Sequence, residues 1–345
     1  MTIGAVVGDV PRVRSGGGRA VVLAGIAVAL LALVTLSLFV GSGDITAAQS
    51  WQALRGVDPD SPAGIIVRDY RVPRTILAVL VGAGLGVAGA VTQALTRNPL
   101  ADPGILGVNS GAFFFVAVAA GFLGVTSIAG YVWFALLGAM LTSVLVYLVG
   151  STGRQGTNPV KIVLTGVAVG AVFTGLSYGI TLTHPDVFDR IRFWQAGSLQ
   201  GRQIDVVVGV APFLVIGVVL ALMLTAGLNA LALGDDVARS LGARTAVVRV
   251  TGFTAIALLC GAATAAVGPL SFVGLMVPHA VRMIAGPDQR RVVPLCVLTA
   301  PVLMLTADIV GRVLLANEVP VGIVVAFLGA PLLIWLVRRP PARAL

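Results

Sequence analysis

The sequence predicts an all-α, polytopic membrane protein with about ten transmembrane helices. Its 345 residues are 57% hydrophobic and only 11% charged, with a mean hydropathy of +1.01, whereas soluble domains carry roughly 25% charged residues. Apolar stretches of about 20 residues, enough to cross a bilayer core about 30 Å thick, recur along the whole chain. Helices are expected because a helix satisfies its own backbone hydrogen bonds in lipid, which an open sheet does not.

Ten spans follow in order along the chain. The first comes after Arg12, Arg14 and Arg19, and its length favours an uncleaved helix over a signal peptide. The eighth is short and is punctuated by Pro269 and Pro278, so it is the weakest full crossing. The expected spans are 20–40, 75–95, 105–123, 128–149, 160–182, 204–226, 251–267, 272–286, 293–310 and 321–337. The chain therefore divides into a 1–19 N-terminal segment, a single transmembrane domain at 20–338 and a 339–345 tail.

The basic residues orient these spans. The net charge is +9, and Lys161 is the single lysine. Basic residues concentrate in the loops on the side of the two termini, so the positive-inside rule places both termini in the cytoplasm. Arginines that include Arg68, Arg71, Arg74 and Arg312 nevertheless fall on the outer side. Since the arginines lie in short loops without interleaved aromatic residues, we expect a membrane, and no nucleic acid, as the partner.

Two inverted five-helix halves would explain an even number of spans, because an odd-numbered unit that is repeated once is inverted in the membrane. The run from Asn98 to Gly107 after the second span resembles the run from Gly268 to Gly274 after the seventh. The match is short and rich in glycine and proline, so chance is the alternative. Two spans are dense in glycine, and small residues three or four apart are typical of closely packed helices; the glycines are Gly82, Gly84, Gly86 and Gly89, and Gly166, Gly170, Gly175 and Gly179.

Motifs for bond chemistry are incomplete in this sequence. The G-x-G-x-x-G run at Gly84 and the G-x-S-x-G run around Ser177 both lie within expected spans, outside the soluble context that gives them meaning. Cys260 and Cys296 lie in apolar segments without metal-site spacing. No phosphate loop exists, because Lys161 follows Asn158-Pro159-Val160 instead of glycine. We therefore expect a non-catalytic chain with no metal or cofactor of its own, with any ATP hydrolysed by a partner.

An ion-coupled secondary transporter is the alternative from another class. Such carriers keep ionisable groups near the middle of the membrane. Asp308 lies near a span end and can pair with Arg312 at i+4, which we interpret as structural.

Several stretches resemble the FecCD family of importer permeases, which carry iron-siderophore complexes or vitamin B12. The residues that carry the resemblance are Arg71-Val72-Pro73-Arg74, Gly89 to Gln93, Asn98 to Gly107, Trp194 to Ser198, Leu231 to Gly234, Ala238 to Gly242, Gly268 to His279, Asp308 to Arg312 and Glu318 to Gly322. The resemblance implies a second permease subunit, identical or paralogous, two ATPase subunits that bind ATP and Mg²⁺, and an extracytoplasmic binding protein in a bacterial cytoplasmic membrane. A ferric siderophore is the expected cargo, with cobalamin or haem as alternatives.

The resemblance also implies two sets of site residues. Arg71, Arg74 and Arg312 would receive acidic residues of the binding protein, although arginines at a span start can also reach lipid headgroups. The segment 228–250, the longest polar interruption, would dock on the ATPase, although an ordinary loop is the alternative. Its docking residues would be Leu233, Gly234, Asp235, Asp236, Arg239, Leu241 and Gly242. Gly234 and Gly242 would end or bend two short helices there, Leu231, Leu233, Val237 and Leu241 would form an apolar face, and Asp235, Asp236, Arg239 and Arg244 would face water.

Overall fold

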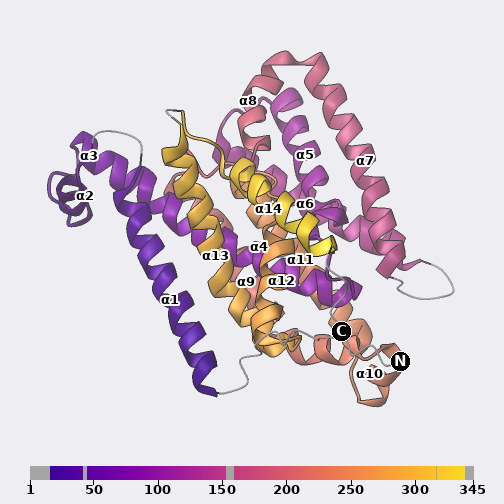
Figure 1. The fold of residues 1–345 in the computed structure, drawn as a ribbon. Coiled ribbons are helices and arrows are strands. Elements are labelled where there is room, and N and C mark those ends of the chain that lie inside the picture. The colour runs from indigo at the N-terminus through magenta and orange to yellow at the C-terminus, as the bar shows by residue number, and fades with distance from the viewer. Residues whose placement is uncertain (1–15, 42–44, 153–158, 316, 339–345) are drawn as a thin grey trace.

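A computed structural model describes residues 16–41, 45–152, 159–315 and 317–338, and every regular element in these ranges is a helix. The 1–19 segment lies largely, and the 339–345 tail entirely, outside the described residues. Figure 1 shows the helices packed as one bundle, with α2 and α8 toward one end and α10 at the opposite end. We refer to these as the α8 end and the α10 end.

Each of the ten predicted spans corresponds to a helix, so the all-helical prediction is confirmed. Seven helical stretches are long and apolar enough to cross a membrane, while α5, α12 and the apolar part of α14 are shorter. The helices are α1 (Gly16–Phe39), α4 (Val72–Thr96), α5 (Val108–Phe122), α6 (Ile128–Ser151), α7 (Pro159–Thr183), α9 (Ile204–Ala232), α11 (Thr245–Val267), α12 (Val273–Ala285), α13 (Gln289–Leu314) and α14 (Val321–Arg338). The expectation that the eighth span is short is confirmed by the 13 residues of α12.

Shorter helices occupy the connections. They are α2 (Ala47–Leu54), α3 (Pro62–Ile65), the π-helical turn Ile66–Arg71, the 3₁₀ turn Pro103–Leu106, α8 (Pro185–Gln195) and α10 (Asp235–Ser240). Thr46 begins α2 with a capping box, in which its hydroxyl accepts a bond from the Gln49 backbone while the Gln49 side chain accepts from the Thr46 backbone.

The two halves are α1 and α4–α7, then α9 and α11–α14, and they run in opposite senses. The third spanning helix of each half, α5 or α12, is short and begins after a residue in the left-handed region, Gly107 with φ of 76° and Phe272 with φ of 71°. The two runs that resemble each other in sequence meet inside the bundle, where the Asp102 carboxylate accepts bonds from the backbone of Gly104 and of Phe272. The inverted repeat predicted from these runs is therefore present in the fold.

Helix α4 lies at the centre and is the most buried of the spans. A Cβ atom added to Gly89 would lie 1.8 Å from the Gly274 carbonyl oxygen, and one added to Gly82 would lie 2.9 Å from the Pro301 Cα. The glycines of α4 thus let α12 and α13 approach its backbone, as predicted. The same interpretation is wrong within this chain for Gly175 and Gly179, since a Cβ at either position meets no atom within 4 Å.

Candidate functional site

Charged residues gather at the α8 end, where α1, α4 and α13 meet. This arginine cluster consists of Arg71, Arg74, Asp308, Arg312 and Glu318. Arg74 donates from Nε and Nη2 to Asp308 Oδ1 at 3.1 and 2.8 Å, and from Nη1 to Glu318 Oε2 at 2.6 Å. Arg312 donates to the other oxygen of the same aspartate, with Nη2 at 2.5 Å from Oδ2. One buried carboxylate therefore accepts hydrogen bonds from two guanidinium groups.

Other donors of the cluster reach the end of α1. Arg312 Nη1 donates to the carbonyls of Ser37 and Val40 at 2.8 and 3.0 Å, and Arg71 Nη1 donates to the carbonyl of Phe39 at 3.1 Å. The last carbonyls of a helix lack partners within the helix and carry its negative dipole end, so cations are favoured there. The two arginines thus fix the end of α1 against α4 and α13.

The sequence correctly predicts that the three arginines share one end of the bundle and that Asp308 pairs with Arg312. It does not predict their burial. Arg71 and Arg312 are each 4% exposed, and every guanidinium of the cluster has partners within the chain. Docking of a binding protein on these side chains stays a prediction, and it requires an exchange of the bonds described here. Glu318, the single glutamate of the chain, is the member of the cluster that sequence reasoning did not assign to this site.

A second group of predicted site residues lies at the α10 end, in the connection from α9 to α11. Gly234 and Gly242 have φ values of 105° and 82°, so they bound α10 as predicted. Leu233, Val237 and Leu241 are 62%, 46% and 65% exposed and form an apolar surface, which we call the α10 surface. Leu231 is buried, so its assignment to this surface is wrong.

The two adjacent aspartates of α10 have different environments. The Asp236 side chain is 97% exposed and lies 3.5 Å from Arg239, so these two residues face water as predicted. Asp235 was also expected to face water, and the structure corrects this. Its carboxylate is held by Arg97 at the end of α4 and by Arg249 of α11, the latter at 2.5 Å. Burial opposes ionisation, but the hydrogen bonds and charges of Arg249 and Arg97 outweigh it and lower the pKa of Asp235.

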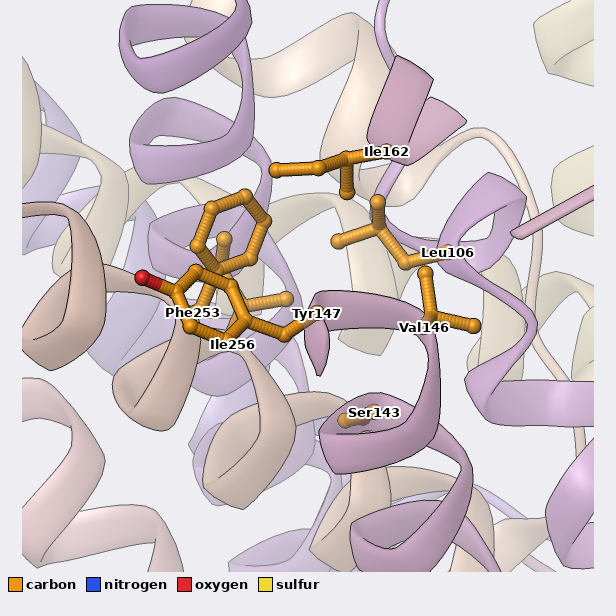
Figure 2. Close-up of a pocket in the computed structure, with 7 residues that line it drawn as sticks. All are labelled: Leu106, Ser143, Val146, Tyr147, Ile162, Phe253 and Ile256. Carbon is orange, nitrogen blue, oxygen red and sulfur yellow. The ribbon is translucent and has the colours of Figure 1, made fainter. Parts of the chain in front are cut away.

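One cavity inside the bundle lies between α6, α7 and α11. The cavity in Figure 2 has a volume of about 10 Å³, enough for no more than one water molecule. Its walls are mostly apolar, and the Tyr147 hydroxyl points away from Leu106, Val146 and Ile162. Within the described ranges no three His, Cys, Asp or Glu side chains come together as metal ligands. The described part of the chain thus presents the arginine cluster at the α8 end and the α10 surface at the opposite end.

Comparison with known proteins identifies this arrangement. The FecCD transport family matches residues 29–339 of the sequence. The chain belongs to the FecCD transport family. Over 93% of its length it is 45% identical to the ferric enterobactin transport system permease protein FepD of Escherichia coli, with 96% of that protein covered. It is 36% identical, over 94% of its length and 98% of the relative, to the probable siderophore transport system permease protein YfiZ of Bacillus subtilis.

A solved structure has the same fold as this FecCD chain. It is described as an inward-facing conformation of a putative metal-chelate type ABC transporter, and it superposes with a TM-score of 0.80 at 28% identity, covering 93% of this chain and 99% of the other. The FecCD chain is therefore a multi-pass transport permease.

Proposed function

We propose that this chain is the permease subunit of an ATP-binding-cassette importer that carries a ferric siderophore across the bacterial cytoplasmic membrane. The observation that carries the proposal is the 45% identity to the ferric enterobactin permease over nearly the full length of both chains. Identity of that extent over nearly the full length of both chains supports the same transport architecture and the same class of cargo.

The proposed chain binds no nucleotide itself, and ATP with Mg²⁺ belongs to a cytoplasmic ATPase dimer. The α10 surface is the proposed contact for that dimer, because exposed leucines on a polar connection are costly unless a partner covers them. In this arrangement the α10 end and both termini face the cytoplasm, and an extracytoplasmic binding protein approaches the arginine cluster at the α8 end.

A second permease, identical or paralogous, completes the proposed pathway. Helix α7 supports this part of the proposal, because only 22% of its most apolar window is buried within the chain and a Cβ added to Gly175 or Gly179 would meet no atom within 4 Å. Small residues on a helix face allow a neighbouring helix to approach closely in lipid.

Uptake in cells with and without this chain tests the proposed cargo. Radiolabelled ferric siderophores, labelled cobalamin and labelled haem are supplied side by side, and we expect loss of ferric siderophore uptake alone when the chain is deleted. Loss of only cobalamin or haem uptake would contradict the cargo. Uptake that survives ATP depletion but collapses with an ionophore would instead support an ion-coupled carrier.

A charged substitution tests the α10 surface. Leu241→Glu places a carboxylate on an exposed position, so the fold should be unaffected while a buried apolar contact with the ATPase is lost. We expect less ATPase to copurify with the variant. Ile204→Glu at the opposite end is the matched control, since it is also exposed but lies at the start of α9. Equal copurification with both variants would contradict the docking proposal.

A further inference from the structure

The connection that carries the α10 surface is attached to the bundle by a small set of charges. The Arg97 guanidinium donates from Nη2 to Asp235 Oδ1 and from Nε to the Leu231 carbonyl at 2.9 Å. Arg249 Nη2 donates to the other oxygen of the same carboxylate at 2.5 Å. We call Arg97, Asp235 and Arg249 the α10 clamp.

Little else fixes the direction of α10. It is a helix of six residues in which Ala238 is the buried side chain. Gly234 and Gly242 flank it with φ values of 105° and 82°, a backbone conformation that favours glycine, and a Cβ added to either would meet no atom within 4 Å, so no side chain packs over either end of the segment. The carboxylate of Asp235 stands directly after the first of these glycines. A charge-assisted bond at that point holds the segment in one orientation.

The two arginines of the clamp come from equivalent helices of the two halves. Arg97 follows the last turn of α4, and Arg249 lies in the second turn of α11. These helices pack against each other in the centre of the bundle. The clamp therefore ties the α10 surface to both halves at once, rather than only to the end of α9 from which the segment emerges.

Helix α4 continues from the clamp to the opposite end. It begins beside Arg74, which is bonded to Asp308 and Glu318, and it ends beside Arg97, which is bonded to Asp235. Between these ends its glycines bring it into backbone contact with α12 and α13. A helix that is packed on all sides moves as a rigid body, so a displacement of its end at the clamp is carried to its other end.

We propose, on the basis of the function proposed above, that the α10 clamp couples the ATPase to the permease, with Arg97 and Asp235 as positioning residues. They hold the docking segment so that its motion becomes a motion of α4 and α11. The clamp does not supply the docking contact itself, which belongs to the exposed leucines of the α10 surface. Without the clamp, the ATPase therefore stays bound, but its motion is no longer transmitted to α4 and α11.

The test uses the complete transporter, with permease, ATPase and binding protein reconstituted in proteoliposomes with a radiolabelled ferric siderophore. Arg97→Gln removes one arm of the clamp, and Arg290→Gln is the control, since Arg290 is an exposed arginine at the same end. Three quantities are measured: ATPase that copurifies, ATP hydrolysed, and siderophore transported per ATP. We expect Arg97→Gln to retain the ATPase but to transport at least about fivefold less siderophore per ATP. The control should match the unmodified chain.

A rescue separates coupling from a general defect of folding. In the double variant Arg97→Cys with Asp235→Cys, a short bifunctional thiol reagent can replace the ion pair, and the two native cysteines are buried. Transport per ATP should be low before bridging and should recover after it. Unchanged transport per ATP in Arg97→Gln, or loss of copurifying ATPase that bridging does not restore, would overturn the clamp proposal. Failure of the proposed function is distinguishable, because then the unmodified chain would itself show no ATP-dependent siderophore uptake.

Discussion

Asp308 is expected to stabilise the fold by holding the buried arginines of the arginine cluster, and Asp308→Asn tests this. The carboxylate is 1% exposed and accepts bonds from both Arg74 and Arg312. The substitution keeps the shape of the side chain but removes its charge and turns one acceptor into a donor. Breaking a buried ion pair by removing one partner costs about 3 to 5 kcal/mol, because the other charge stays buried.

Neighbouring acceptors limit the expected cost. Arg74 retains Glu318, and Arg312 retains the Ser37 and Val40 carbonyls. We therefore expect the lower part of that range, about 3 kcal/mol, and, for a chain of 345 residues, a fall in Tm of about 4 °C. Thermal unfolding of the purified permease in nanodiscs, followed by near-UV circular dichroism, measures the shift.

A matched control makes the result decisive. Asp236→Asn removes a carboxylate that is almost fully exposed, and such surface changes are within about 0.5 kcal/mol. If the two variants melt at the same temperature, the carboxylate of Asp308 does not compensate the buried arginines, and the description of the cluster as a structural unit is refuted.

Three further predictions concern packing, an unpaired cation and pH. Gly89→Ala should abolish the folded peak in size-exclusion chromatography, because its methyl group would collide with the Gly274 carbonyl, whereas Gly175→Ala should leave that peak unchanged. Arg202→Met should raise Tm, since the Arg202 Nε has no partner and burial lowers the pKa of Arg202 to about 10, a shift that corresponds to about 3 kcal/mol against the charged form; a lower Tm would contradict this. The pKa of Asp235 is lowered on folding, so the Asp235 carboxylate stabilises the fold at neutral pH and this stabilisation is lost as the pH falls below about 4. Tm should therefore fall less steeply with acidification in Asp235→Asn than in the unmodified chain.

Hydropathy predicts the spanning helices well because lipid leaves the backbone few alternatives. It finds even the short α12, whose apolar run lies between Gly268 and Gly286. It does not predict α8, whose sequence Pro185–Gln195 is too polar to stand out and whose helix depends on a proline in its first turn. Nor does it show that the chain before α5 turns back into the bundle to meet Phe272, since that contact joins segments far apart in the sequence.

The sequence predicts where the site residues lie along the chain, but not which side chains surround them. The position of Arg74 at the start of a span follows from the sequence, but its partners Asp308 and Glu318 are 234 and 244 residues away. The same limit applies to Asp235. Its neighbour Asp236 has the same side chain and the same local sequence, and only the distant Arg97 and the nearby Arg249 make the two different. The sequence around α10 alone therefore does not show which of the two aspartates is paired with arginines.

The preference of this chain for arginine over lysine follows from what its basic residues do. Lys161 is the only lysine among 23 basic residues. Arg312 donates at once to a carboxylate, to the Ser37 hydroxyl and to two carbonyls at the end of α1. A guanidinium has five donors in a fixed plane, whereas an ammonium is a point charge with three. Helix ends present several carbonyls without partners inside the helix. The wide, planar set of arginine donors can reach such carbonyls and a carboxylate at the same time, whereas the three lysine donors all lie on one nitrogen. The same property lets Arg97 hold both the end of α9 and the carboxylate of Asp235, which is why one side chain can fix the direction of a segment bounded by two glycines.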